Sequence, residues 1–210
     1  MLGSALRRTA TLVATLALVL PVSLSAQTMP AEQLSALDFR HIGVVGNRVA
    51  SVTGVYGNPL VYYAGAASGG LWKTEDGGIR WRPVFDDQDV HSIGALAVAT
   101  SDPNIVWAGT GEPHIRSNVT IGNGVYKSTD GGDNWEHMGL DATGRISRIV
   151  VNPQNPDIVY VAALGNTHAP QQERGIYRTT DGGETWEQVL FVDENTGASS
   201  VIMDPNNPRI

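Results

Sequence analysis

An eight-residue pattern occurs three times in the chain and constrains its fold more than any other feature. It reads (Ser/Thr)-x-Asp-Gly-Gly-x-x-Trp and is centred on Asp76, Asp130 and Asp181. These aspartates are 54 residues apart (76 to 130) and then 51 residues apart (130 to 181). A period of about 50 residues is typical of proteins built from stacked units, including propellers. The chain is therefore expected to consist of repeated structural units.

Turn residues divide each repeat into four short segments of strand-like sequence. Four antiparallel strands at this period define the blade of a β-propeller, and roughly 4–8 blades close around an axis. The sequence therefore predicts an all-β fold, a partial β-propeller of four-stranded antiparallel blades. The predicted strands are Val49–Val55, Leu60–Ala64, Gly70–Lys73 and Trp81–Phe85 in the first repeat, Ile93–Ala99, Ile105–Gly109, Gly124–Ser128 and Trp135–Met138 in the second, and Ile146–Val151, Ile158–Ala163, Gly175–Arg178 and Trp186–Phe191 in the third.

The predicted propeller occupies residues 39–210, with complete blades at about 49–85, 93–138 and 146–191. An incomplete fourth blade covers 199–210 and starts with a strand at Ser199–Met203. The segment Phe39–Gly43 matches Trp135–Gly139, so we expect it to be a fourth strand that completes the last blade and closes the ring. We expect that last blade, and the others needed for closure, outside these 210 residues.

The N-terminal region has the pattern of a secretory signal peptide. Arg7 and Arg8 precede an apolar run at Thr11–Val19, and small residues lead to an expected cleavage after Ala26. A retained membrane anchor is the alternative, but the run is shorter than the about 20 residues that a span requires. We therefore expect a signal peptide at 1–26, a lead-in segment at 27–38, a secreted or periplasmic location and no stable membrane span after cleavage.

Charge and cysteine content exclude several classes of function. The formal net charge is −7, and removal of residues 1–26 takes away Arg7 and Arg8 but no acid, leaving −9. Nucleic acid is therefore not expected as a partner, because phosphate binding requires clustered Lys and Arg. The chain has no cysteine, which excludes disulfide bonds, a thiol nucleophile and a lipid-bearing cysteine.

The repeated pattern resembles the Asp-box, or BNR repeat, of sialidases, xyloglucanase-type glycoside hydrolases and the sortilin/VPS10 propeller. The resemblance covers residues 39–210 and is specific for the repeat, not for one activity. The residue chemistry favours a structural role, because a turn carboxylate accepts amide hydrogen bonds and the glycines supply positive φ. The family resemblance also implies that these turns lie opposite the ligand-binding face. The residues expected to be structural are Asp76, Trp81, Asp130, Trp135, Asp181 and Trp186.

Strand parity predicts which loops form the opposite face. The repeated turns join third and fourth strands, so the second-to-third loops and the crossings between blades collect at the other end of each sheet. Loops carried by a rigid scaffold commonly supply binding groups. These loops are Val44–Arg48, Ala66–Gly69, Asp86–His91, Glu112–Asn123, Leu140–Arg145, Asn166–Arg174 and Asp193–Ala198.

Ionisable residues on these loops are the candidate ligand-binding groups. Some precede the first strand of a blade and are expected at the mouth of the central channel; others lie on the two longest loops. Together they could grip a polar or anionic ligand, or form a solvated rim with local salt bridges. The histidine spacing does not indicate a metal site, and no cofactor is predicted. The candidates are Arg48, His91, His114, Arg116, Arg145, His168 and Arg174.

Two functions are compatible with this reading. One is a sortilin/VPS10-like propeller that binds a peptide or carbohydrate on its loop-rich face. The alternative is a glycoside hydrolase acting on polysaccharide, which requires two carboxyl groups around the scissile bond. Glu112 is the first candidate for one of these, followed by Asp89 and Asp141. The xyloglucanase-like resemblance implies a catalytic aspartate before a Gly-Gly pair in the first blade, where this chain has Ala67-Ser68, so the binding function is preferred.

Overall fold

The computed structural model describes Val44 and residues 48–208. The predicted signal peptide, lead-in segment and ring-closing strand lie outside the described residues. Within the described part, regular structure consists of β-strands and one short 3-10 helix, η1 (Asp141–Thr143). No helix in this part is long and apolar enough to cross a membrane.

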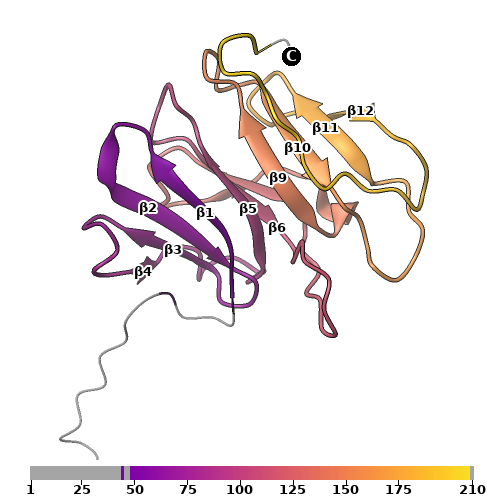
Figure 1. Cartoon of the computed structure of the whole chain (residues 1–210), viewed down its shortest axis with the longest axis horizontal. Coiled ribbons are helices and arrows are strands. Elements are labelled where there is room, and N and C mark those ends of the chain that lie inside the picture. The colour runs from indigo at the N-terminus through magenta and orange to yellow at the C-terminus, as the bar shows by residue number, and fades with distance from the viewer. Residues whose placement is uncertain (1–43, 45–47, 209–210) are drawn as a thin grey trace, which may run out of the picture. The chain divides into compact units, whose positions relative to one another are not determined.

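The strands form three separate four-stranded antiparallel sheets, which follow one another along the chain (Figure 1). In each sheet the strands pair in sequence order. The predicted four-stranded antiparallel blades are thereby confirmed. Blade 1 contains β1 (Val49–Val55), β2 (Asn58–Ala66), β3 (Leu71–Thr74) and β4 (Arg82–Pro83); blade 2 contains β5 (Ile93–Val98), β6 (Val106–Thr110), β7 (Val125–Ser128) and β8 (Glu136–His137); blade 3 contains β9 (Ile146–Val151), β10 (Val159–Ala163), β11 (Gly175–Thr179) and β12 (Glu187–Leu190).

The segment at 199–203 differs from the sequence-based expectation. It was predicted as the first strand of a fourth blade, but the structure assigns no strand there. A strand is defined by its ladder partner, and none of the described residues supplies one for this segment; the nearest pairing is an isolated bridge between Asp204 and Asn207. The residue just before this segment is held on blade 3, because the amide of Ala198 donates to the carbonyl of Ala163 at 3.0 Å.

Neighbouring blades approach most closely at their first strands. Strand β5 packs against β1 on one side and against β9 on the other. Glycines make this approach possible: a Cβ on Gly65 would lie 2.4 Å from Cγ2 of Ile93, and a Cβ on Gly109 would lie 2.4 Å from Cγ2 of Ile146. The first-strand isoleucine of each following blade therefore packs on a glycine in the second strand of the preceding blade.

Two hydrophobic cores fill the spaces between the blades. Each core combines residues from consecutive blades, so burial of apolar area, worth about 25 cal/mol per Å², stabilises the stacking of blades as well as each sheet. The core between blades 1 and 2 contains Tyr63, Leu71, Phe85, Val90, Ile93, Val106, Ala108 and Tyr126. The core between blades 2 and 3 contains Ala95, Trp107, Val125, Ile146, Ile149, Val159, Val161, Ala163 and Tyr177.

In blades 2 and 3, the tryptophan of the repeated pattern links the blade to the one before it. The Nε1 of Trp135 donates to the carbonyl of Val84 in blade 1 at 2.7 Å, and the Nε1 of Trp186 donates to the carbonyl of Met138 in blade 2 at 2.7 Å. Trp135 also makes an edge-to-face contact with Phe85, with ring centroids 5.3 Å apart. The repeated tryptophan therefore combines an apolar contact with a hydrogen bond across each interface.

Candidate functional site

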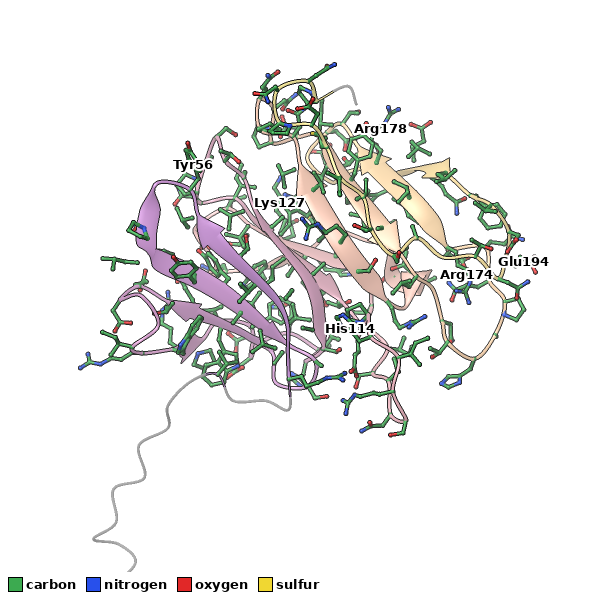
Figure 2. The ribbon with its side chains drawn as sticks, viewed as in Figure 1. Tyr56, His114, Lys127, Arg174, Arg178 and Glu194 are labelled. Atoms are coloured by element: carbon green, nitrogen blue, oxygen red, sulfur yellow. The ribbon has the colours of Figure 1, made fainter. Side chains whose placement is uncertain are left out.

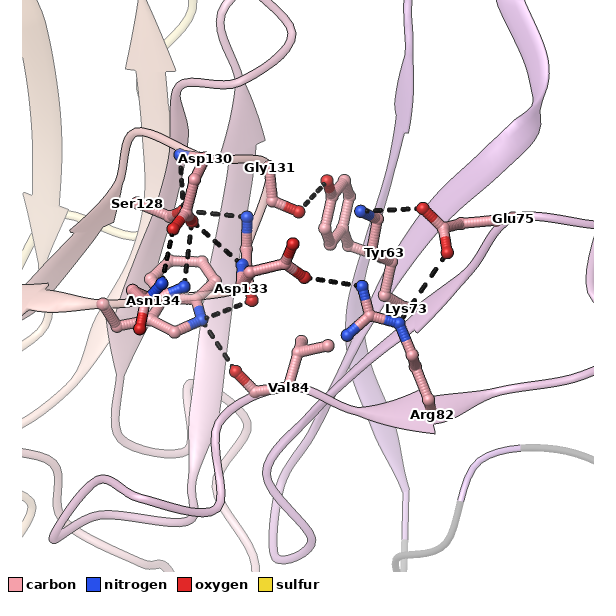
Figure 3. A network of polar contacts seen from close by, with 12 residues as sticks. Tyr63, Lys73, Glu75, Arg82, Val84, Ser128, Asp130, Gly131, Asp133 and Asn134 are labelled. Carbon is pink, nitrogen blue, oxygen red and sulfur yellow. Dashed lines mark hydrogen bonds and ion pairs between the residues drawn. The ribbon is translucent and has the colours of Figure 1, made fainter.

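The aspartate of each repeated pattern, here called the Asp-Gly-Gly turn, holds its own hairpin. In blade 2, the hydroxyl of Ser128 donates to Oδ1 of Asp130 at 2.8 Å and accepts the amide of Gly132 at 2.8 Å (Figure 3). Asn134 donates its backbone amide to Oδ1 of Asp130 at 2.9 Å and its side-chain amide to Oδ2 at 2.6 Å. The hydroxyl-to-carboxylate bond and the two backbone-amide bonds recur in blades 1 and 3.

These hydrogen bonds stabilise the ionised form of all three aspartates. Hydrogen bonds from the side chain and backbone of Asn134 lower the pKa of Asp130 to about 2. The pKa of Asp181 is lowered mainly by the hydroxyl of Thr185, and that of Asp76 mainly by the backbone amide of Arg80. A general acid must hold a proton near the operating pH, so these carboxylates are unsuited to that role.

The Asp-Gly-Gly turns of blades 2 and 3 are also held by the preceding blade. The hydroxyl of Tyr63 donates to the carbonyl of Gly131 at 2.7 Å, and Nζ of Lys127 donates to the carbonyl of Gly182 at 2.9 Å. Arg82 forms an ion pair with Asp133 at 2.7 Å across the same interface (Figure 3). Burial is the main cause that raises the pKa of Tyr63 to about 12, so this donor keeps its proton at neutral pH. The contacts of these turns are thus structural.

Acidification should test this role of Asp130. Its folded-state pKa of about 2 lies below the ordinary aspartate value of 3.8, so its contribution to stability is present above pH 3.8 and is lost as the pH falls towards 2. We expect Asp130→Asn to lower the melting temperature by about 2–4 °C at pH 7, since solvent screens this exposed group, and by less at pH 2.5. Thermal melts of both proteins across this range measure the difference, and a constant difference would contradict the assignment.

The second-to-third loops meet the crossings between blades at the other end of the sheets. The amides of Ala67, Gly111 and Leu164 donate to the carbonyls of Arg48, Ser92 and Arg145, respectively, at 2.8–2.9 Å. The Asp-Gly-Gly turns bond instead to the first-to-second turns, for example through the amide of Gly131 and the carbonyl of Asn104 at 2.9 Å. Figure 2 shows the same separation: Tyr56 and Arg178 lie towards the top of the view, and His114 and Arg174 lie lower.

The same bonds show which residue directly precedes the first strand of each blade, a position expected for His91 in blade 2. Arg48, Ser92 and Arg145 are the matching residues before the first strands, so Ser92 and not His91 occupies this position in blade 2. The carbonyl of His91 accepts the amide of Gly70 at 2.9 Å, while the side chain is exposed. His91 therefore lies on the predicted face, one residue before the matching position.

Glu112 lies in a different environment from the exposed loop that the sequence suggested. Its side chain has 0% exposure, and it forms ion pairs with Arg48 and with Arg116, whose Nε is 2.7 Å from Oε1. Its amide also donates to the carbonyl of Thr120 at 2.8 Å, which closes the loop. The carboxylate is therefore enclosed by protein and paired with two cations, so direct contact with a substrate is not available to it in this conformation. The same ion pairs engage the guanidinium groups of Arg48 and Arg116, so these groups are only partly available to a ligand.

Two other predicted ligand-binding arginines are also buried. Arg174, 8% exposed, donates through its Nη atoms to the carbonyls of Leu164, Asn166 and Ala169 in its own loop. Arg145, 4% exposed, donates from Nε to the carbonyl of Gly165 at 2.7 Å. Both guanidinium groups therefore lie beneath the β10–β11 loop and hold its backbone, whereas the sequence placed them at an open rim.

Two cavities on this face are lined by described residues. One of about 560 Å³ is lined by Ser68, Gly69, Asp89, Val90, His91, Thr120 and Ile121. The other, of about 450 Å³, is lined by Ile115, Arg145, Leu164, Asn166, Thr167, His168, Ala169, Pro170, Arg174, Asn195 and Gly197. The sequence ranks Asp89 below Glu112 and does not single out Thr167. For Asp89, the available signal was its place on the crossing between blades 1 and 2, next to the β2–β3 loop that also lines the cavity. His114 and His168 are exposed. No group of three or more His, Asp or Glu among the described residues is arranged to hold a metal ion.

No protein-family model matches the chain. Over 160 residues it is 28% identical to xyloglucanase Xgh74A of Acetivibrio thermocellus, a match that covers 69% of this chain and 17% of that protein. Over 116 residues it is 30% identical to the photosystem II assembly lipoprotein Ycf48 of a Synechococcus species, covering 55% of this chain and 28% of that protein. The matched region is thus a small part of the length of each relative.

A solved structure shows a similar fold. The crystal structure of an ancestral GH74 enzyme matches with a TM-score of 0.56 and 21% identity, over 74% of this chain and 20% of that one. The relatives support the wider resemblance to propellers of the glycoside hydrolase kind, but not the specific resemblance to sortilin/VPS10. The chain is part of a β-propeller with a glycosidase-like fold.

Proposed function

We propose that this chain forms part of a β-propeller glycoside hydrolase that cleaves a polysaccharide. The observation that carries the proposal is the 28% identity to a xyloglucanase over 69% of the chain. The predicted N-terminal signal pattern agrees with it, because a secreted or periplasmic location would bring the protein to extracellular polysaccharides. Of the two functions considered from the sequence, this replaces the sortilin/VPS10-like receptor.

The cavity beside blades 1 and 2 is the proposed place for part of the substrate. Asp89 and His91 reach it from the crossing between the blades, and Ser68 and Gly69 reach it from the β2–β3 loop. Glycoside hydrolysis generally uses two carboxyl groups, one as acid and one as base or nucleophile. Asp89 is exposed and lines the cavity, so we propose it, and not the enclosed Glu112, as a carboxyl group in contact with the glycan.

Release of reducing ends tests this function. We expect the protein to depolymerise xyloglucan or another polysaccharide in a panel, and Asp89→Asn to lower kcat by about 10²-fold or more, the usual range for loss of an acid or base. Asp157→Asn is the matched control, because Asp157 is an exposed aspartate beside an Asp-Gly-Gly turn on the opposite face. Full activity of Asp89→Asn would remove Asp89 from the site, and failure to cleave any polysaccharide would remove the hydrolase function.

A non-catalytic binding propeller is the second candidate. The observation that favours it is the 30% identity to the assembly lipoprotein Ycf48 over 116 residues. This function predicts saturable binding of a polypeptide or glycan to the loop face without release of reducing ends. The same panel distinguishes the two functions when binding is measured alongside turnover.

A further inference from the structure

The cavity of about 450 Å³ beneath the β10–β11 loop has an unusual charge environment. Its volume lies within the range of small-ligand sites, about 300–1,000 Å³. Two of its lining residues, Arg145 and Arg174, are more than nine-tenths buried. Neither takes part in an ion pair among the described residues. The cavity is therefore bounded by two buried cations that lack a directly paired carboxylate.

Hydrogen-bonding groups at this cavity are only partly satisfied. The carbonyls of residues 164, 165, 166 and 169 accept bonds from the two guanidinium groups. After these bonds, Nη1 of Arg145 and Oγ1 of Thr167 are buried and have no partner among the described residues; Nε of Arg174 is in the same state. A buried donor without an acceptor costs about 1–3 kcal/mol, and more when it is charged. These two groups thus favour a ligand that brings acceptor oxygens.

The surrounding charges favour an anion over a neutral acceptor. Burial is the main cause that lowers the pKa of Arg145, and the nearby positive charge of Arg174 lowers it further. Asp193 senses the charge of Arg174, but its pKa is lowered mainly by the backbone amide of Asn195 and least by Arg174, and it forms no ion pair with either arginine among the described residues. An anionic group in the cavity would supply the missing charge, because buried charges are normally paired.

The other residues that line this cavity indicate which kind of anion it could bind. It contains no Trp, Tyr or Phe within the described part, so an aromatic platform for the flat face of a neutral sugar is absent from this lining. A planar carboxylate matches the geometry of a guanidinium and can accept from a hydroxyl at the same time. Asn166, His168 and Asn195 add polar groups around the cavity for the hydroxyls of a sugar ring.

We propose that this cavity binds the carboxylate of a uronic acid residue in an acidic polysaccharide, through Arg145 and Thr167. The inference rests on the proposed polysaccharide function and assigns that function an acidic substrate class, in contrast to the neutral glycan named for the xyloglucanase relative. Arg174 holds the loop that forms the cavity wall and raises the local positive charge.

Calorimetric titration of the full-length protein with a galacturonate oligosaccharide, a neutral xyloglucan oligosaccharide and a peptide with a free C-terminal carboxylate tests the proposal. We expect the uronate to bind at least tenfold more tightly than the neutral oligosaccharide and to lose affinity as salt is raised. Arg145→Gln should weaken uronate binding by about 10–100-fold, and Thr167→Val, which has no protein hydrogen bond to lose, by about 3–10-fold. Arg80→Gln, on an Asp-Gly-Gly turn, is the control and should leave binding unchanged.

The outcomes separate the inference from the function on which it rests. Equal binding of neutral and acidic oligosaccharides, unaffected by Thr167→Val, would overturn the acidic substrate class and leave the polysaccharide function standing. Binding of the peptide carboxylate in preference to both oligosaccharides would overturn the assignment to uronic acid. Absence of binding and cleavage with every glycan would overturn the proposed function itself. If Arg145→Gln does not fold, Thr167→Val decides alone.

Discussion

Trp135→Ala is expected to lower the free energy of unfolding by about 3 kcal/mol, the lower end of the range for truncating a core tryptophan. The lower end applies because Trp135 is only partly buried. The indole packs on Phe85 at a centroid distance of 5.3 Å and donates to the carbonyl of Val84 at 2.7 Å, both in the preceding blade. Its loss therefore weakens the interface between blades 1 and 2, and not just one hairpin.

Denaturant unfolding and thermal melting measure this effect. At about 2–4 °C per kcal/mol for a chain of this size, the melting temperature should fall by roughly 6–12 °C. Trp135→Phe keeps an aromatic ring but loses the indole donor, so about 1 kcal/mol is expected. Tyr56→Ala is the control, because Tyr56 is 85% exposed and surface substitutions usually change stability by less than about 0.5 kcal/mol. Equal effects of Trp135→Ala and Tyr56→Ala would contradict the inter-blade role.

The repeated pattern and the strands were predictable because local chemistry specifies them. Turn residues bound each strand, and β1 and β9 have the predicted bounds, Val49–Val55 and Ile146–Val151. The outer strands were less predictable. β8 extends only over Glu136–His137, where four residues were expected, because the length of an edge strand depends on how far its ladder with β7 continues. The length of this ladder is a property of both strands together, and the composition of one strand does not encode it.

The candidate site was predictable only at the level of loops. Strand parity gave the face, and the backbone bonds of Ala67, Gly111 and Leu164 agree with that reasoning. Burial of individual charges could not be inferred, because it depends on partners from other segments. Arg174 is enclosed since its loop folds back to place three carbonyls around it. Such charged residues are mostly exposed in proteins unless they are paired, which is why an open rim was expected.

Glu112→Ala is expected to destabilise the protein by about 1–3 kcal/mol, because the guanidinium groups of Arg48 and Arg116 lose their shared acceptor. The cost stays below that of breaking a fully buried pair, since the two arginine side chains are 41% and 23% exposed and water can solvate them. The carboxylate has 0% exposure and pairs with Arg48 and Arg116. Arg48 precedes blade 1, whereas Glu112 and Arg116 belong to the β6–β7 loop of blade 2, so the variant should also loosen that loop. Unfolding by denaturant gives the energy, and hydrogen exchange of residues 112–123 reports the loop.

Glu112→Gln distinguishes this structural role from catalysis by the same residue. The amide keeps the shape but lacks the charge that the two arginines require, so we expect a lower melting temperature and faster loop exchange, with any loss of turnover accompanied by these changes. Glu75→Gln is the matched control: Glu75 also pairs with two cations, Lys73 and Arg82, but its side chain is 58% exposed, and an exposed pair contributes about 0–1 kcal/mol. Loss of turnover in Glu112→Gln at unchanged stability and loop exchange would instead restore Glu112 as a catalytic residue, and would require the β6–β7 loop to open during the reaction.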